Sequence, residues 1–229
     1  MRMWQLIRAT SLERHVHAEA YAALVLSGSY EEAGDNGRFA VSAGDVVFHD
    51  RFEAHLDRFS KQGAMVLNLQ LGSCHHVAPG IASVADPDFI ARLAKKNHKE
   101  AVDFLLSVAK IWVPCASDWP DELATQLIQN PSLKLSEWGA HRRLATWNIS
   151  RGFARVFGIS PEAFRTRVRA RLALRSIEDS QTPLARIAAD LGFADQAHMT
   201  RSVRRLTGTT PGSWRSTANG FKTQRQSAV

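Results

Sequence analysis

Apolar residues in the first third of the chain follow a pattern typical of β-strands. Residues 20–30, 38–49 and 64–71 are apolar or alternating runs rich in Val, Leu and Phe, separated by clusters of Gly, Asp and Asn. Strands joined by such short connections pair in antiparallel order. We therefore predict an antiparallel β-barrel or sandwich within residues 1–85.

Helical spacing replaces this pattern after residue 86. Apolar side chains recur every three or four positions and predict two amphipathic helices. These side chains are Phe89, Ile90, Leu93, Val102, Leu105, Leu106 and Ala109. Such helices either pair two copies of the chain into a homodimer or pack onto the β domain, and the pattern leaves both interpretations open. Residues 112–120, with two prolines, are the best linker candidate.

The last part of the chain contains an internal repeat. Residues 151–165 align with residues 201–215 at an offset of fifty, which indicates two copies of one supersecondary unit. In each copy a glycine ends a helix, and a hydroxyl residue followed by a proline starts the next one. The aligned pairs are Arg151 with Arg201, Phe153 with Val203, Arg155 with Arg205, Gly158 with Gly208, Ser160 with Thr210, Pro161 with Pro211 and Phe164 with Trp214.

Each copy has the pattern of a helix-turn-helix. In the second copy Thr182-Pro183 opens a helix that stops at Gly192, and Asp195 caps a further helix with its apolar residues on one face. Such a unit lays its second helix in the major groove of DNA. The first copy is predicted within residues 135–157, with its second helix over residues 146–157.

A long helix is predicted between the two units. Residues 161–177 would form a helix of about 26 Å. That length suits two recognition helices entering successive major grooves about 34 Å apart on modestly bent DNA. Five arginines of this helix either touch phosphates or form a solvated face: Arg165, Arg167, Arg169, Arg171 and Arg175.

Charge is distributed unevenly along the chain. Residues 139–229 hold 16 Lys and Arg against 5 Asp and Glu, whereas the whole chain has a net charge of +7. Most of these cations are Arg, whose planar fork suits phosphates and base edges. Double-stranded DNA is therefore the expected partner. A membrane is not expected, because the long uncharged segment 62–85 is interrupted by Gln, Asn, His and Pro.

The sequence LARIAADLGFADQAHMTRSVRRLTGTTPGSWR, residues 184–215, resembles the C-terminal signature of the AraC/XylS family of bacterial transcription regulators. The resemblance extends over residues 119–215 and implies two helix-turn-helix units joined by a long helix. It also implies contact with RNA polymerase, transcription activation and no enzymatic activity.

The fold expected from the patterns and the resemblance is a two-domain α+β chain. A cupin-like antiparallel barrel at 1–85 would be the sensor, and 86–117 a helical linker. Residues 118–218 would be the all-α DNA-binding domain, and 219–229 a flexible basic tail.

Exposed residues on the second helix of each unit are the predicted DNA contacts. Gln pairs with adenine, Arg with guanine, and Ala packs against a thymine methyl group, whereas Arg204 and Arg205 are expected on phosphates. The first unit contributes Thr146, Trp147, Asn148, Ser150, Arg151 and Arg155. The second contributes Gln196, Ala197, His198, Thr200, Arg201, Arg204 and Arg205.

The first unit departs from the family pattern at three positions. Gly139 replaces a usual Ala, Arg143 a common turn glycine, and Ala145 a frequent capping Ser. These departures leave open whether the first unit reads bases.

The β domain looks like a reduced cupin. Metal-binding cupins hold their ion with two histidines, a glutamate and a third histidine. His15, His17 and His55 match three of these positions, but Tyr21 stands at the glutamate position. We therefore predict no cofactor and keep the three histidines as candidates for a divalent metal, the alternative being that they line an effector pocket or the barrel rim. The cluster Cys74-His75-His76 is expected in a surface loop.

The resulting prediction is a sequence-specific regulator that is controlled by a small-molecule effector in its barrel. Two alternatives are a metal-dependent cupin enzyme fused to a DNA-binding tail and a nonspecific architectural DNA binder. Charges within the first fifteen residues argue against a signal peptide, and two cysteines suit a reducing compartment, so we expect a cytoplasmic location.

Overall fold

The computed structural model describes residues 3–8, 11–72, 80–112 and 118–216. The chain divides into two compact units. The first contains residues 1–122 and 155–158, and the second contains residues 123–154 and 159–229. Among the described residues, no helix combines the length and the apolar composition that crossing a bilayer requires.

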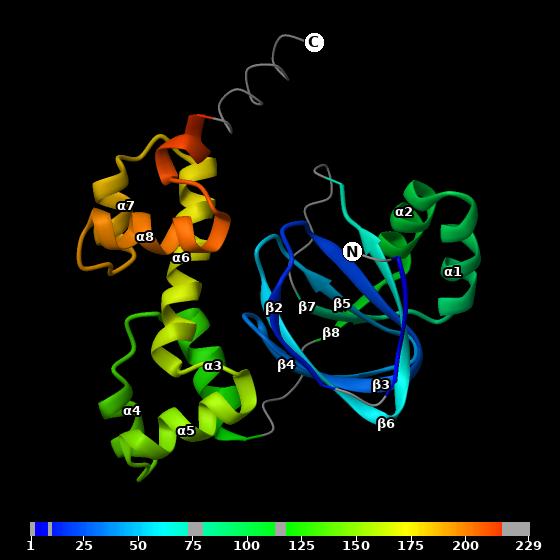
Figure 1. Cartoon of the computed structure of the whole chain (residues 1–229), viewed down its shortest axis with the longest axis horizontal. Helices are drawn as coiled ribbons and strands as arrows, with labels where there is room; N and C mark the ends of the chain where they lie inside the picture. The colour runs from blue at the N-terminus through cyan, green and yellow to red at the C-terminus, as the bar shows by residue number, and fades with distance from the viewer. Residues whose placement is uncertain (1–2, 9–10, 73–79, 113–117, 217–229) are drawn as a thin grey trace. The chain divides into compact units, whose positions relative to one another are not determined.

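The first unit is built on an antiparallel sheet (Figure 1), which confirms the β prediction. Its described strands follow the order β1-β6-β3-β5-β7-β8, with β2 also paired to β6 and β4 to β3. Their bounds are β1 Trp4–Ile7, β2 Ser11–Val16, β3 Tyr21–Gly34, β4 Gly37–Ser42, β5 Asp45–His49, β6 Ala54–Gln70, β7 Gly80–Ser83 and β8 Lys110–Trp112.

Two long strands, β3 and β6, form the centre of the sheet and give it two faces. They pair from Tyr21 with Gln70 to Gly34 with His55, with irregular register near Gly28. Gly28 has φ +75° and packs so closely that a Cβ there would lie 2.0 Å from the carbonyl oxygen of Gly63. Only glycine fits this backbone approach, which interrupts the regular pairing of both strands.

Alternate residues of the strands form two separate hydrophobic clusters. One contains Tyr21, Ala23, Val47 and Val66, and the other contains residues of opposite parity such as Leu24. This period of two is what the alternation along a strand dictates.

Helices α1 (Pro87–Lys96) and α2 (His98–Val108) cover the Leu24 face of the sheet (Figure 1). Ile90 and Leu105 are fully buried in the same cluster as Leu24. Of the two interpretations of these helices, packing onto the β domain is therefore observed, while a homodimer remains a prediction. Phe89 and Phe104 stay partly exposed, with ring centroids 5.0 Å apart.

The second unit is helical, with two helix-turn-helix units around one long helix (Figure 1), as predicted. Its helices are α3 Trp119–Gln129, α4 Leu135–His141, α5 Thr146–Phe157, α6 Pro161–Asp179, α7 Leu184–Asp190 and α8 Gln196–Thr207, of which the first turn of α3 and the last turn of α5 belong to the first unit. α6 ends two residues later than predicted. α7 begins at Leu184 with Pro183 at its N-cap and no side-chain cap, so Thr182 does not cap it.

Each helix-turn-helix has its own small core. In the first, Phe153 of α5 meets Phe164 of α6 edge to face at 5.3 Å between ring centroids, and both rings are fully buried. In the second, Met199 and Val203 of α8 are fully buried, and Ile187 of α7 nearly so. These positions recur every three or four residues, which is why the helical pattern was legible in the sequence.

The internal repeat extends to side-chain contacts. Arg165 Nη2 donates to the carbonyl oxygen of Leu133 at 2.7 Å, and Arg215 Nη2 donates to that of Thr182 at 2.8 Å. Each carbonyl lies two residues before the first helix of its unit. Arg169 Nη2 likewise donates to the carbonyl oxygen of Pro131. Arg165 and Arg169 thus hold the second unit together, a role that neither interpretation of these arginines included.

The two turns share one backbone geometry. Leu144 N donates to Gly139 O at 2.9 Å, and Phe193 N donates to Ala188 O at 3.0 Å. The left-handed turn residue is Gly192 in the second unit but Arg143, with φ 55°, in the first. A non-glycine residue in this conformation costs about 1–2 kcal/mol.

Arg143→Gly is therefore expected to stabilise the second unit by about 0.5–1 kcal/mol, the relief of strain less the added chain entropy of glycine. Urea unfolding of the full chain measures the change. The matched control is Arg142→Gly, at φ −104° and with its guanidinium 4.3 Å from the Trp138 ring, which is expected to destabilise. A variant at Arg143 no more stable than wild type contradicts the assignment of strain.

Candidate nucleic-acid interface and sensor cavity

Helix α8 presents a polar face opposite its buried one. Asp195 caps the helix by accepting a hydrogen bond from His198 N at 2.6 Å, as predicted. The exposed residues are Gln196, Ala197, Arg201, Arg204 and Arg205, while His198 and Thr200 are half-buried. The His198 ring also packs edge to face on Phe193 at 5.3 Å, so it helps to hold the turn against the helix.

Helix α5 presents the equivalent face in the first unit. Thr146, Trp147, Asn148, Arg151 and Arg155 are exposed, and Ser150 is half-buried. Trp147 is 61% exposed, so it does not cover the small core. The Arg151 guanidinium lies 5.8 Å from the centre of that indole ring, one helical turn away.

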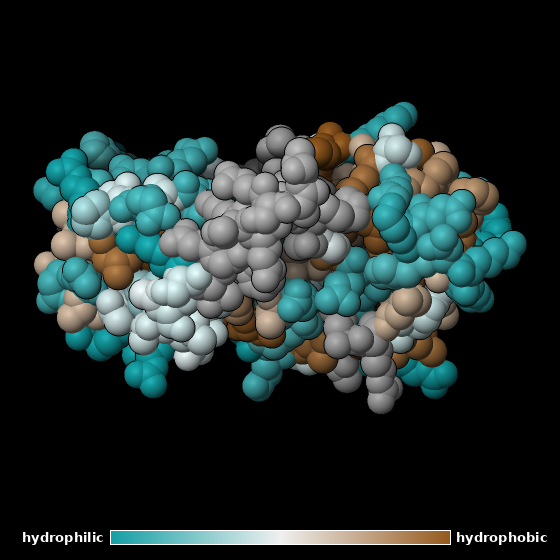
Figure 2. Space-filling view, turned by 90° about the horizontal axis from the view of Figure 1, so that it is seen from above, coloured by the Kyte–Doolittle hydropathy of each residue, from teal (hydrophilic) through white to brown (hydrophobic). Residues whose placement is uncertain are grey.

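The two recognition helices therefore match position by position. Thr146, Ser150 and Arg151 of α5 correspond to Gln196, Thr200 and Arg201 of α8, fifty residues later. The connecting helix α6 has 19 residues, a length of about 28 Å. The face of the helical unit that is seen on the left of Figure 2 is largely hydrophilic.

Asp195→Ala is expected to destabilise the second unit by about 1 kcal/mol, because an N–H at the start of α8 loses its acceptor. Urea unfolding of the full chain measures this loss. Asp195→Ser is the control, since a serine oxygen also caps well and should recover most of the stability. Equal losses in both variants would show that capping is not the role of Asp195.

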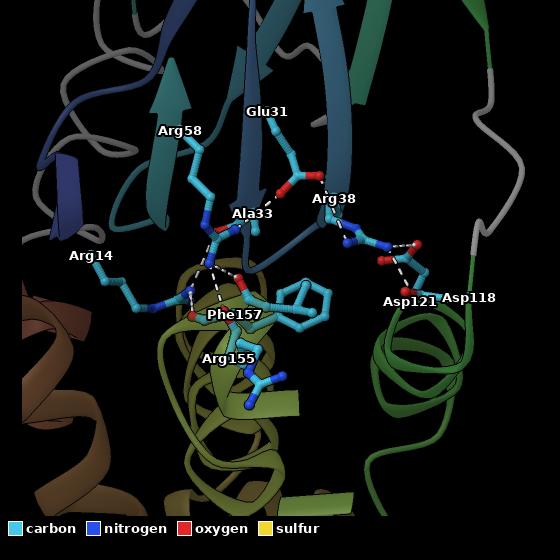
Figure 3. Close-up of polar contacts among 10 residues, drawn as sticks. Arg14, Glu31, Ala33, Arg38, Arg58, Asp118, Asp121, Arg155 and Phe157 are labelled. Carbon is cyan, nitrogen blue, oxygen red and sulfur yellow. Dashed lines mark hydrogen bonds and ion pairs between the residues drawn. The ribbon is translucent and has the colours of Figure 1, made fainter. Parts of the chain in front are cut away.

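Three arginines of the first unit bind helix ends within that unit (Figure 3). Arg14 Nη1 donates to the carbonyl oxygen of Phe157 at 2.8 Å, and Arg14 also pairs with Asp35. Arg58 Nη2 donates to the carbonyl oxygens of Arg155 and Val156 at 2.6 and 3.0 Å. These contacts satisfy carbonyls that a helix C-terminus leaves without intrahelical partners.

Arg38 binds a different helix end. Its Nη2 donates to Asp118 Oδ1 at 2.8 Å and to Asp121 Oδ2 at 2.7 Å, at the start of α3 (Figure 3). These contacts could not be predicted from the local sequence, because the partners are far apart along the chain.

A cavity of about 220 Å³ lies inside the first unit, on the Tyr21 face of the sheet. Its polar lining has four histidines, two carboxylates, two tyrosines and two amides: His15, His17, His49, His55, Glu32, Asp57, Tyr21, Tyr30, Gln5 and Asn68. The structure brings together the three histidines selected from the sequence, with the His15 ring 4.4 Å from His55 and 4.9 Å from His17. His15 lies within strand β2, not before the first strand as expected.

Three further polar residues of the cavity were not predicted from the sequence. Glu32 lies on β3, paired with Asp57 of β6, and His49 ends β5. The residues around Glu32 had been interpreted as a turn. The alternation of Glu32 with Tyr30 was the signal that this strand continues, since both side chains line the cavity.

Burial shifts the protonation of these groups. Burial raises the pKa of Glu32 well above its usual value, and Asp57 and Glu53 add to the shift. Burial raises the pKa of Asp57 to about 7. Burial, reinforced by neighbouring histidines, lowers the pKa of His17 to about 4 and that of His55 well below its usual value. The rings of His17 and His55 are therefore neutral at pH 7 and offer lone pairs to a ligand.

Other predicted features lie outside the described residues. These are the cluster Cys74-His75-His76 and the basic tail 219–229.

Residues 138–217 match the family model described as a helix-turn-helix domain. No curated protein matches the chain.

Several solved structures are similar to the chain. ToxT from Vibrio cholerae O395 has a TM-score of 0.43 and 10% identity over 95% of this chain and 99% of its own. A probable AraC family transcriptional regulator from Rhodopseudomonas palustris CGA009 has a TM-score of 0.40 and 24% identity over 42% and 93%. The DNA-binding domain of AdpA, in complex with a target DNA, has a TM-score of 0.43 and 20% identity over 47% and 99%.

The matched segment contains α5, α6, α7 and α8, with both polar faces, so this part of the chain is a helix-turn-helix domain.

Proposed function

We propose that the chain is a sequence-specific regulator that reads promoter DNA with both α5 and α8. The observation that carries this proposal is the matched pair of exposed polar faces, with Arg151 and Arg201 at equivalent positions on helices joined by α6. An arginine on such a face can pair with two acceptors of one guanine. The departures at Gly139 and Arg143 do not change the turn, since both units have the same backbone hydrogen bond there.

We further propose that a small-molecule effector binds in the cavity of the first unit. The cavity offers neutral imidazoles, carboxyl groups and the Tyr21 hydroxyl, which suit a small polar ligand or an ion. Such an effector regulates only if its affinity differs between DNA-bound and free states of the chain. DNA then changes effector affinity by the same factor.

We also propose a cellular location and two macromolecular partners for the regulator. The regulator acts in the cytoplasm, where bacterial DNA is. The resemblance to the AraC/XylS family supports contact with RNA polymerase. The exposed Phe89–Phe104 pair on α1 and α2 supports the formation of a homodimer.

The test is selection of bound sequences from a random double-stranded DNA pool, using the full chain at physiological salt. The expected result is a motif of two blocks, one helical turn apart, one for each recognition helix. A single block would show that only one unit reads bases. No enrichment, with binding that falls steeply with salt on any DNA, would identify an architectural binder instead.

A further inference from the structure

Three buried side chains of the cavity form a compact group of metal-ligating atoms. Glu32 of β3, His49 of β5 and His55 of β6 are 1%, 2% and 3% exposed. One ligand atom from each lies within 4.8 Å of the others. His49 Nε2 is 3.5 Å from Glu32 Oε2. Three different strands therefore bring one carboxylate and two imidazoles to the same point.

Several atoms of this group have no hydrogen-bond partner among the described residues. They are Glu32 Oε1, His55 Nδ1 and both ring nitrogens of His49, which lie 3.5 Å from Glu32 Oε2 and 3.4 Å from Glu53 Oε1 without hydrogen-bond geometry. Buried polar atoms are normally satisfied, and a buried carboxylate needs a proton or a cation. Hydrophobic side chains at these positions would avoid the free-energy penalty of burying polar atoms without hydrogen bonds. The group therefore indicates that a ligand binds here.

We propose that Glu32, His49 and His55 bind one divalent transition-metal ion. Two imidazoles and one carboxylate are ligands that Zn²⁺, Fe²⁺, Co²⁺ and Ni²⁺ accept. In a tetrahedral site with bonds of about 2.0–2.1 Å, neighbouring ligand atoms lie about 3.3 Å apart. The observed 3.5 Å between His49 and Glu32 is close to that separation.

Tyr21 orients two of the proposed ligands. Its ring stacks on His49 at 4.3 Å between centroids, and its hydroxyl lies 3.5 Å from His55 Nε2. Groups that fix the rings of ligating histidines in this way are typical of metal sites. The tyrosine that replaces the expected carboxylate thus supports the site from beside it, while Glu32 supplies the negative charge.

A second group competes for His55. His15, His17 and His55 also have ligand atoms within 4.8 Å of one another. However, His15 and His17 are only half-buried, and this set contains no carboxylate to balance the charge of the ion. Because one imidazole binds one ion here, the fully buried set with Glu32 is the favoured one.

Metal binding by this set goes beyond the proposed function, and it is measured without DNA. The probe is the full chain without a histidine tag, stripped with a chelator and dialysed against Zn²⁺, Co²⁺ or Ni²⁺. Elemental analysis is expected to give one ion per chain, and Co²⁺ is expected to develop visible absorption. At a free ion concentration of 100 times Kd, the unfolding temperature of the first unit should rise by about 5 °C or more. Substoichiometric metal on the folded wild type overturns the proposal.

The decisive variant is Glu32→Gln, which keeps the shape of the side chain. It is expected to weaken metal binding at least about tenfold and to change the Co²⁺ spectrum, while the metal-free protein remains as stable as wild type or more so. His49→Gln gives a second test with the same expected loss. His17→Gln tests the competing set, and the matched control is His141→Gln, an exposed histidine of α4 outside the cavity, which should bind as wild type does. Unchanged binding by Glu32→Gln, or a tenfold loss in His17→Gln, overturns this choice of ligands.

Discussion

Phe153→Ala is expected to destabilise the DNA-binding domain by about 3–5 kcal/mol and to abolish specific DNA binding. The Phe153 ring is fully buried and meets the equally buried Phe164 edge to face at 5.3 Å. Removing it leaves a cavity between α5 and α6 and also loses the aromatic contact. Since α5 carries one recognition face, its displacement removes half of the proposed DNA contacts. Urea unfolding of the full chain, followed by tryptophan fluorescence, measures the loss.

Trp147→Ala is the control for this variant. Trp147 lies on the same helix but is 61% exposed, so its loss should change stability by no more than about 0.5 kcal/mol. If Phe153→Ala proves as stable as Trp147→Ala, the core described for the first helix-turn-helix is wrong.

Arg201→Ala is expected to weaken binding to the selected DNA site by about 5- to 150-fold, which corresponds to about 1–3 kcal/mol. Arg201 is exposed on the polar face of α8, one turn after Ala197. Removing a bidentate contact to guanine should also relax the preference at one base of the motif. Fluorescence anisotropy with the site and its single-base variants measures both effects.

Arg205→Ala separates base reading from phosphate binding. Arg205 is exposed one turn beyond Arg201, where phosphate contact is expected. Its loss should weaken binding to all sequences about equally and lower the salt dependence by about one ion. If Arg201→Ala behaves in this uniform way instead, Arg201 does not read a base.

The helical unit could be predicted closely because its signals are local. Asp195 caps α8 as expected, and Gly192 and Gly208 adopt the left-handed conformation that ends a helix. The predicted recognition helices match α5 and α8 at both ends. Even the strained turn at Arg143 was visible as a departure from the usual glycine.

The β domain was predicted in outline but not in detail. Strand β2 was missed because its residues, Ser11–Val16, are mostly polar and exposed, as on a solvated strand. Strands β7 and β8 have four and three residues, too few for alternation to show. Strand β3 continues through two glutamates and a glycine that resemble a turn, and its pairing with β6 shows that the strand does not end there.

The two candidate sites differ in the same way in how far the sequence predicts them. The exposed residues of α5 and α8 follow from helical periodicity, but the group formed by Glu32, His49 and His55 depends on the register of three strands. His49 ended an apolar run and gave no sign that its ring faces a cavity. Contacts of Arg165 and Arg215 with backbone carbonyls were equally invisible, although the repeat already aligned the two arginines.

The most direct test of the central claim is the spacing between the two blocks of the selected DNA site. Because α5 and α8 are joined by the 19-residue helix α6, they are expected to enter major grooves a fixed distance of about 34 Å apart. Inserting about half a helical turn between the blocks rotates one groove away and should weaken binding at least about tenfold, whereas changing the bases between the blocks at constant length should not. Equal affinity for the inserted site would contradict the claim that both helices read DNA.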